Sequence, residues 1–214
     1  TIKGAGSTSV TATQAGNDDY EAFQKEFSLL INKAPLTITA DSKSMVYGDN
    51  TPTYTVTYTG LKYNETKPAL THNLVLYCSA TNTSNVGQYN IQPSAATSNN
   101  YNITFVAGTL TINKAPLTIT AEDKSMLYGN DIPAYDAIFS GFKNNETPAV
   151  LTTQPTLTCT ATSASNVGTY DIVPSGATAV NYSISYNNGT LTVDKASLTV
   201  TAKSYTITQG STLP

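Results

Sequence analysis

The sequence predicts a mainly β protein built from tandem modules, each a mostly antiparallel sheet with one short helix. Three observations support this prediction. The segment NKAPLTIT occurs at 32–39 and again, letter for letter, at 113–120, and a related DKASLTVT follows at 194–201. Thr supplies 37 of the 214 residues, and this β-branched residue favours strands over helices. Apolar residues also recur at alternate positions, which is the period of a strand with one buried face.

The repeat has a constant spacing of 81 residues, which separates Lys33 from Lys114 and Lys114 from Lys195. The same spacing joins further pairs, namely Tyr47-Gly48 and Tyr128-Gly129, Pro52 and Pro133, Cys78 and Cys159, and Asn100-Tyr101 and Asn181-Tyr182. Such agreement in a single register indicates an internal repeat. We therefore predict four regions: the C-terminal part of a preceding module at 1–32, complete modules at 33–113 and 114–194, and the start of a truncated third module at 195–214.

Six strands are expected in each module. In the first module the alternating apolar residues place them at 36–40, 54–58, 76–80, 89–91, 101–105 and 110–112, and the second module repeats the pattern. The fifth and sixth strands are expected to form a hairpin around Gly108, because glycine is common in such turns.

One segment in each module departs from the strand period. NETKPALT at 64–71 and NETPAVLT at 145–152 place Pro near the start of a short apolar run, which is typical of a helix start. We expect one short helix here, covering a sheet face. A β-grasp-like, two-layer arrangement is the preferred interpretation, and an immunoglobulin-like β-sandwich is the alternative.

The joins between modules are short and contain proline. Pro35 and Pro116 follow Lys33 and Lys114 directly before the first strand of each module, and their rings fix φ. No Gly/Ser-rich linker separates the modules. The sequence therefore predicts stiff joins.

Composition argues against several classes of partner. All 11 basic residues are Lys and the net charge is −3, so the chain lacks both Arg for base or phosphate recognition and a basic surface. No stretch approaches the roughly 18 apolar residues of a membrane span. We expect neither nucleic-acid binding nor membrane insertion.

The sequence offers little catalytic chemistry. His72 is the only histidine, and no set of nucleophile, base and orienting residues recurs in both modules. Cys78 and Cys159 occupy equivalent positions in different modules, too far apart for a disulfide. Each lies at an inward position of a strand, where cysteine packs as a small apolar residue. We expect two buried free thiols and no catalytic residue.

Two polar features of the modules leave alternatives open. The pairs Tyr47-Gly48 and Tyr128-Gly129 fit either a recognition loop or a β-turn, and the turn is preferred because Gly, Asn, Asp and Pro surround them. Calcium is the one cofactor considered, although no calcium-loop spacing is present. The candidates are acidic residues near the joins, chiefly Asp49 and Asp131, with Asp41, Glu122 and Asp123 beside them.

Several of these motifs together resemble a known family. KAPLTITA at 33–40 and 114–121, followed by Y-G-x-x-x-P at Tyr47-Gly48…Pro52 and Tyr128-Gly129…Pro133, resembles the MBG modules (YGX type) of large bacterial cell-surface adhesins. Residues 1–32 resemble the end of a bacterial immunoglobulin-like repeat. The resemblance implies a non-enzymatic stalk segment of a secreted, extracellular adhesin or filament, whose partners are neighbouring modules. The alternative is an adhesive binding module whose variable loops contact glycan or protein ligands.

Overall fold

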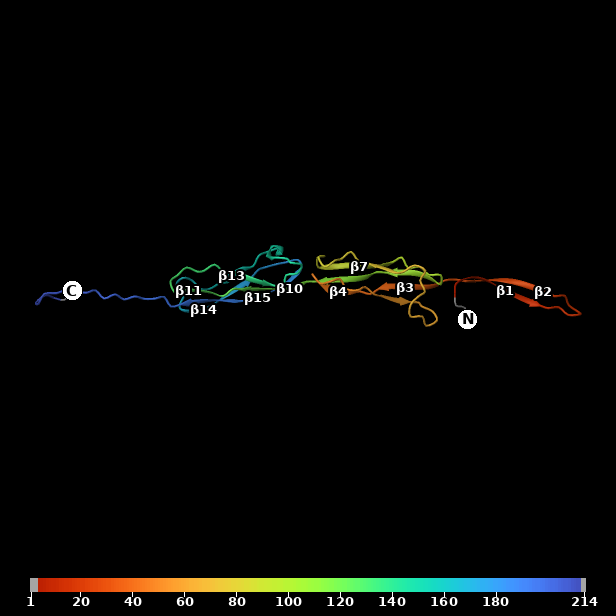
Figure 1. The fold of residues 1–214 in the computed structure, drawn as a ribbon, viewed down its shortest axis with the longest axis horizontal. Coiled ribbons are helices and arrows are strands. Elements are labelled where there is room, and N and C mark those ends of the chain that lie inside the picture. The colour runs from red at the N-terminus through yellow and green to blue at the C-terminus, as the bar shows by residue number, and fades with distance from the viewer. Residues whose placement is uncertain (1–3, 213–214) are drawn as a thin grey trace. The chain divides into compact units, whose positions relative to one another are not determined.

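The computed structural model describes residues 4–212, so the ends of the predicted terminal segments, residues 1–3 and 213–214, lie outside the described residues (Figure 1). The chain forms two compact units. The first runs to Ala115 and also includes Phe142–Thr147 and Val180–Ser183. The second contains Pro116–Gly141, Pro148–Ala179 and the chain from Ile184 onward. The predicted module boundaries stay predictions.

Nearly every regular element is a strand, and the strands recur in the same order in both repeats. A hairpin comes first, formed by β1 (Gly6–Gln14) and β2 (Phe23–Ile31). The first repeat then contains β3 (Ala34–Ala40), β4 (Lys43–Val46), β5 (Val56–Thr59), β6 (Val75–Tyr77), β7 (Gly87–Ser94), β8 (Tyr101–Val106) and β9 (Gly108–Asn113). The second contains β10 (Ala115–Ala121), β11 (Lys124–Leu127), β12 (Ala137–Ser140), β13 (Thr156–Cys159), β14 (Gly168–Ser175), β15 (Tyr182–Asn187) and β16 (Gly189–Asp194).

Each repeat has one three-stranded and one four-stranded sheet. The first repeat has the orders β5-β3-β8 and β4-β9-β7-β6, and the second has β12-β10-β15 and β11-β16-β14-β13. β3 pairs with β8 in parallel, and β4 pairs with β9 in parallel. In the first repeat the chain passes from one sheet to the other at every connection except the one between β6 and β7. The six predicted strands are present, and β4 with its counterpart β11 was not predicted.

The predicted short helix is wrong. The segment in the first repeat has turns only, and the second repeat has a single three-residue 3₁₀ turn, η1 (Pro148–Val150). Asn64 and Asn145 have φ values of 60° and 58°, in the left-handed region that interrupts a right-handed helix. Too few residues remain afterwards for a helix to nucleate. Without a helical layer the β-grasp interpretation fails, and the two-sheet alternative is closer to the observed module.

The predicted hairpin of the fifth and sixth strands is also wrong. β8 and β9 follow each other with one residue between them, but they belong to different sheets. Gly108 serves close packing here, because a Cβ atom on it would lie 2.4 Å from the carbonyl oxygen of Ala40. Gly189 meets the oxygen of Ala121 in the same way, at 2.5 Å. Glycine thus permits the two chain segments to approach where the sheets meet.

Alternate apolar residues of the strands form the cores. One cluster in the first repeat has the members Leu36, Ile38, Ala96 and Tyr101. One cluster in the second repeat has the members Ala121, Met126, Ala161, Ile172, Leu191 and Val193. No helix in the described part of the chain has the length and apolar character needed to cross a membrane.

Candidate functional site

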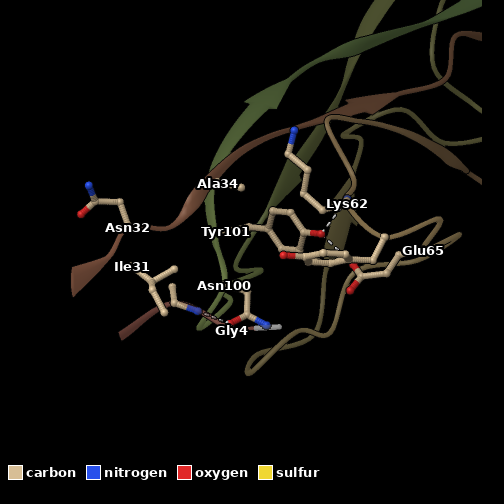
Figure 2. Close-up of a pocket in the computed structure, with 10 residues that line it drawn as sticks. Gly4, Ile31, Asn32, Ala34, Lys62, Glu65, Asn100 and Tyr101 are labelled. Carbon is tan, nitrogen blue, oxygen red and sulfur yellow. Dashed lines mark hydrogen bonds between the residues drawn. The ribbon is translucent and has the colours of Figure 1, made fainter. Parts of the chain in front are cut away.

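A buried tyrosine at the start of β8 organises a polar cluster in the first repeat. Tyr101 is 4% exposed, and its hydroxyl accepts a hydrogen bond from the backbone N–H of Lys62 at 3.0 Å. The same hydroxyl donates to Oε2 of Glu65 at 2.7 Å. Figure 2 shows the Tyr101 ring beside both residues. Burial, followed by the Glu65 hydrogen bond, raises the pKa of Tyr101 above its ordinary value.

The neighbouring Asn100 connects this cluster to the chain on either side of the hairpin. Its backbone carbonyl accepts from the N–H of Ala34 at 2.9 Å, and its Oδ1 accepts from the N–H of Ala5 at 3.0 Å. Figure 2 shows the Asn100 side chain reaching toward Gly4. A small pocket lies here, lined by Gly4, Ala5, Ile31, Asn32, Ala34, Lys62, Tyr63, Glu65, Asn100 and Tyr101. We call Lys62, Glu65, Asn100 and Tyr101 the first polar cluster.

The same arrangement recurs 81 residues later, at Lys143, Glu146, Asn181 and Tyr182, which we call the second polar cluster. The Tyr182 hydroxyl accepts from the Lys143 N–H at 2.9 Å and donates to Glu146. The Oδ1 of Asn181 accepts from the N–H of Val86 at 3.0 Å, as Asn100 accepts from Ala5. All of these residues belong to the first compact unit.

The second polar cluster has an additional partner in the Tyr47-Gly48 turn. The Tyr47 hydroxyl donates to Oε1 of Glu146 at 2.6 Å, and its ring meets that of Tyr182 edge-on, with centroids 5.6 Å apart. Lys143 Nζ lies 3.0 Å from Oδ1 of Asp49. Burial and the Glu146 hydrogen bond raise the pKa of Tyr182 to about 12. One carboxylate therefore accepts from two buried tyrosines.

The predicted Tyr-Gly residues lie in turns with left-handed glycines. Gly48 has φ of 83° and Gly129 has φ of 85°, a conformation that favours glycine. The side chain of Tyr47 is 3% exposed, whereas that of Tyr128 is 48% exposed. Pro52 and Pro133, which complete the motif, are both half-buried.

The residues predicted at the joins lie on the surface. Pro35 and Pro116 are exposed near the start of β3 and β10. Lys33 is exposed as well, and its Nζ donates to the carbonyl of Ser98 at 2.7 Å, which places it next to the first polar cluster. Lys114 is also exposed.

The cysteines lie apart from both polar clusters. Cys78 and Cys159 are free thiols that are half-buried. Each lies beside a tyrosine, Tyr54 or Tyr135, whose buried hydroxyl has no hydrogen-bond partner among residues 4–212. Burial, with the nearby thiol adding to it, raises the pKa of both tyrosines to about 12.

The acidic candidates for calcium are not gathered into one site. Asp49 forms the ion pair with Lys143, and Asp131 is exposed in the turn after Gly129. Across residues 4–212, no group of three or more His, Cys, Asp or Glu side chains is placed to hold a metal ion. His72 is exposed, with Nδ1 2.8 Å from the Thr97 hydroxyl.

Sequence reasoning found part of the polar clusters. The 81-residue spacing identifies the Asn-Tyr pairs Asn100-Tyr101 and Asn181-Tyr182, but not the lysine and glutamate residues that they contact. Their signal was present, because Lys62-x-x-Glu65 and Lys143-x-x-Glu146 recur at the same spacing. Exposed surfaces vary between repeats, so two charged residues kept at one spacing indicate a shared contact.

Comparison with known families gives one result. A family model described as MBG domain (YGX type) matches residues 36–111 and, a second time, residues 117–192. No curated protein matches the chain.

Proposed function

Because the chain belongs to the MBG domain (YGX type) family, we propose that it is a non-enzymatic stalk segment of a large secreted bacterial surface adhesin or filament. The family suggests a repeat module of surface-associated proteins. In this role the modules lie outside the cell, have neighbouring modules of the same chain as partners, and hold a more distal part away from the envelope.

The observation that carries the proposal is the repeated polar cluster. Asn100-Tyr101 and Asn181-Tyr182 each bind backbone N–H groups from an earlier part of the chain, through hydrogen bonds of the same type and length. A spacer requires joins that keep their geometry. Hydrogen bonds to the buried Tyr101 and Tyr182 provide this, because breaking one leaves a buried hydroxyl unsatisfied at a cost of about 1–3 kcal/mol.

Distances between spin labels on equivalent surface positions test the stalk proposal. Gln88 and Thr169 are exposed, so both are replaced by cysteine for labelling, with Cys78 and Cys159 changed to Ala. Electron paramagnetic resonance then gives the distribution of distances between the two repeats. We expect a narrow distribution that broadens in Glu146→Ala.

Glu65→Ala is the matched control, because it removes the equivalent carboxylate from the first polar cluster, which does not contact Tyr47 or Tyr182. Its distribution should stay as narrow as that of the parent protein. A broad distribution in the parent protein, or one that Glu146→Ala leaves unchanged, would contradict the stalk proposal. Narrowing that occurs only after calcium is added would instead assign the rigidity to a metal, with Asp49 and Asp131 as the first residues to test.

A binding module is the second candidate function, and exposed tyrosines favour it. Tyr63 is 61% exposed and Tyr77 is 64% exposed, and such rings stack on sugars or pack against protein partners. A glycan array and a host-protein array probed with the labelled chain test this candidate. Binding that Tyr77→Ala abolishes would support it, whereas an absence of binding on both arrays leaves the spacer role as the better account.

A further inference from the structure

The first and last segments of the first repeat run side by side in the same direction. We call residues 34–46, which contain β3 and β4, the entry segment, and residues 101–113, which contain β8 and β9, the exit segment. Ala34 lies beside Tyr101 in one sheet and Lys43 lies beside Leu110 in the other, a separation of 67 residues in both. The two segments therefore keep one parallel register from end to end, although each of them crosses between the sheets.

The crossing is itself held together by close packing and a hydrogen bond. Gly108 of the exit segment lies so near the entry segment that a Cβ atom on it would be 2.4 Å from the carbonyl oxygen of Ala40. The N–H of Thr109 donates to Oγ of Ser42 at 3.1 Å. The contact between the two segments thus continues where the strand pairing changes from one sheet to the other.

Backbone hydrogen bonds close both ends of this pair. The N–H of Ala34 donates to the carbonyl of Asn100, and the N–H of Tyr47 donates to the carbonyl of Asn113, both at 2.9 Å. The chain enters the repeat at Ala34 and leaves it at Asn113, which lie at opposite ends of the pair. Tension along the chain therefore pulls the two neighbouring segments in opposite directions along their own length.

Paired strands resist this direction of pull well. Hydrogen bonds between strands run from one strand to the next, so sliding strains all of them together, whereas peeling breaks them one at a time. Sliding would also drag buried side chains of both segments out of the core, namely Leu36, Ile38, Leu110 and Ile112, which are between 0% and 1% exposed. Both effects raise the barrier to unfolding, and this barrier sets the force that a repeat withstands.

The second repeat has the same arrangement. Lys124 of β11 lies beside Leu191 of β16 in a parallel pair, again 67 residues apart, and β10 is the neighbour of β15. At its crossing the N–H of Thr190 donates to Oδ1 of Asp123 at 2.7 Å, the position that Ser42 occupies in the first repeat. The parallel pair is therefore a feature of the module and does not depend on one particular set of surface residues.

We propose that the entry and exit segments form a mechanical clamp, which lets each repeat bear tension along the chain without unfolding. The inference rests on the proposed stalk function, because a stalk that is fixed at one end and pulled at the other carries tension. The clamp acts inside each repeat, whereas the polar clusters hold the joins.

Optical tweezers measure the force at which the first repeat of the full chain unfolds. Handles are attached through Asn32→Cys and Asn113→Cys, at exposed residues, with Cys78 and Cys159 changed to Ala. In the matched control Asn50→Cys replaces Asn32→Cys, so that the force acts at one end of the pair and peels the segments apart. We expect a several-fold higher unfolding force with the first pair of handles. Equal forces would overturn the proposal.

Substitutions at the crossing test the clamp with the first pair of handles. Ser42→Ala removes the hydrogen bond to Thr109 and should lower the unfolding force. Ser42→Asp copies Asp123 and should raise it, because a charged acceptor strengthens a hydrogen bond. Ser44→Ala, at another exposed serine, is the matched control and should leave the force unchanged. A loss in Ser44→Ala as large as that in Ser42→Ala, with the fold intact by circular dichroism, would overturn the proposal.

The clamp and the stalk proposal can fail separately, because the spin-label distances test the joins without load. Unfolding forces that do not depend on the position of the handles, together with narrow distance distributions, would overturn the clamp and support the stalk. Broad distance distributions, together with forces that depend on the handles as expected, would contradict the stalk and support the clamp.

Discussion

The two Tyr-Gly turns have the same residues and nearly the same backbone, yet their tyrosines have different environments. Gly48 and Gly129 have φ values of 83° and 85°, and each donates its N–H to an equivalent carbonyl, of Asn82 at 3.1 Å and Ser163 at 3.2 Å. Tyr47 is nonetheless buried, and Tyr128 is half exposed. The difference cannot come from the turn itself.

The cause is the second polar cluster. Glu146 and Tyr182 cover Tyr47, and Lys143 packs so closely that a Cβ on Gly48 would lie 2.4 Å from its Cβ. At Gly129 an added Cβ would meet nothing within 4 Å. The glycine of the motif thus sets the turn, while Tyr47 gains its burial from Glu146 and Tyr182, which lie 99 and 135 positions later in the sequence. In the first repeat, the Tyr-Gly pair is therefore a contact surface in addition to a turn.

The largest expected effect separates the two tyrosines directly. Tyr47→Ala should lower the free energy of unfolding by about 3 kcal/mol, because it removes a buried aromatic ring and leaves a cavity. Tyr128→Ala should change it by less than about 1 kcal/mol, since that ring is half exposed. Urea unfolding of the full chain, followed by circular dichroism, measures both. Equal losses in the two variants would contradict the comparison.

A smaller effect is expected from the carboxylates of the two clusters. Glu146→Ala leaves the hydroxyls of Tyr47 and Tyr182 without their acceptor and should cost about 2 kcal/mol. Glu65→Ala affects Tyr101 alone and should cost about 1 kcal/mol. Hydrogen exchange at the N–H of Lys143 and of Lys62 reports each site separately. The account would be wrong if Glu65→Ala accelerated exchange at Lys143 as strongly as Glu146→Ala does.

Alkaline pH should produce the smallest effect. The pKa of Tyr182 is raised from 10.0 to about 12, so its neutral form is favoured in the folded state. The stability this contributes is complete below pH 10 and is lost as the pH rises from 10 through 12. Tyr182→Phe cannot ionise, so its stability should fall less steeply over this range. Unfolding midpoints of the parent protein and of Tyr182→Phe, measured from pH 8 upward, test this. If the midpoint fell equally steeply with pH in both proteins, the result would count against the raised pKa of Tyr182.

The repeat and most strands were predictable, because apolar residues occupy the same alternate positions in both copies. Leu36 and Ile38, with their counterparts Leu117 and Ile119, are all between 0% and 1% exposed, as their alternation indicates. The short strand β4 was missed because Lys43–Val46 contains few apolar residues, and its pairing with β9 depends on a distant partner.

Other features could not be predicted, because one residue type serves several structures. Glycine suits both a hairpin turn and a close approach of two chain segments, and only the three-dimensional packing shows that Gly108 does the second. Pro-Ala-Leu suits a helix start, but left-handed asparagines precede it here. The recurrence of Lys143 and Glu146 in the repeat indicates a shared contact, but the sequence does not identify Tyr182, 39 and 36 residues away, as the residue that they contact.

The most direct test of the account is whether the Tyr47 ring contacts the Tyr182 ring in solution. The account predicts nuclear Overhauser cross-peaks between the two rings, whose centroids are 5.6 Å apart, in protein with labelled tyrosine assigned through Tyr47→Phe and Tyr182→Phe. It also predicts that a soluble paramagnetic agent broadens Tyr128 and spares Tyr47. Absent cross-peaks, together with equal broadening of Tyr47 and Tyr128, would contradict the account.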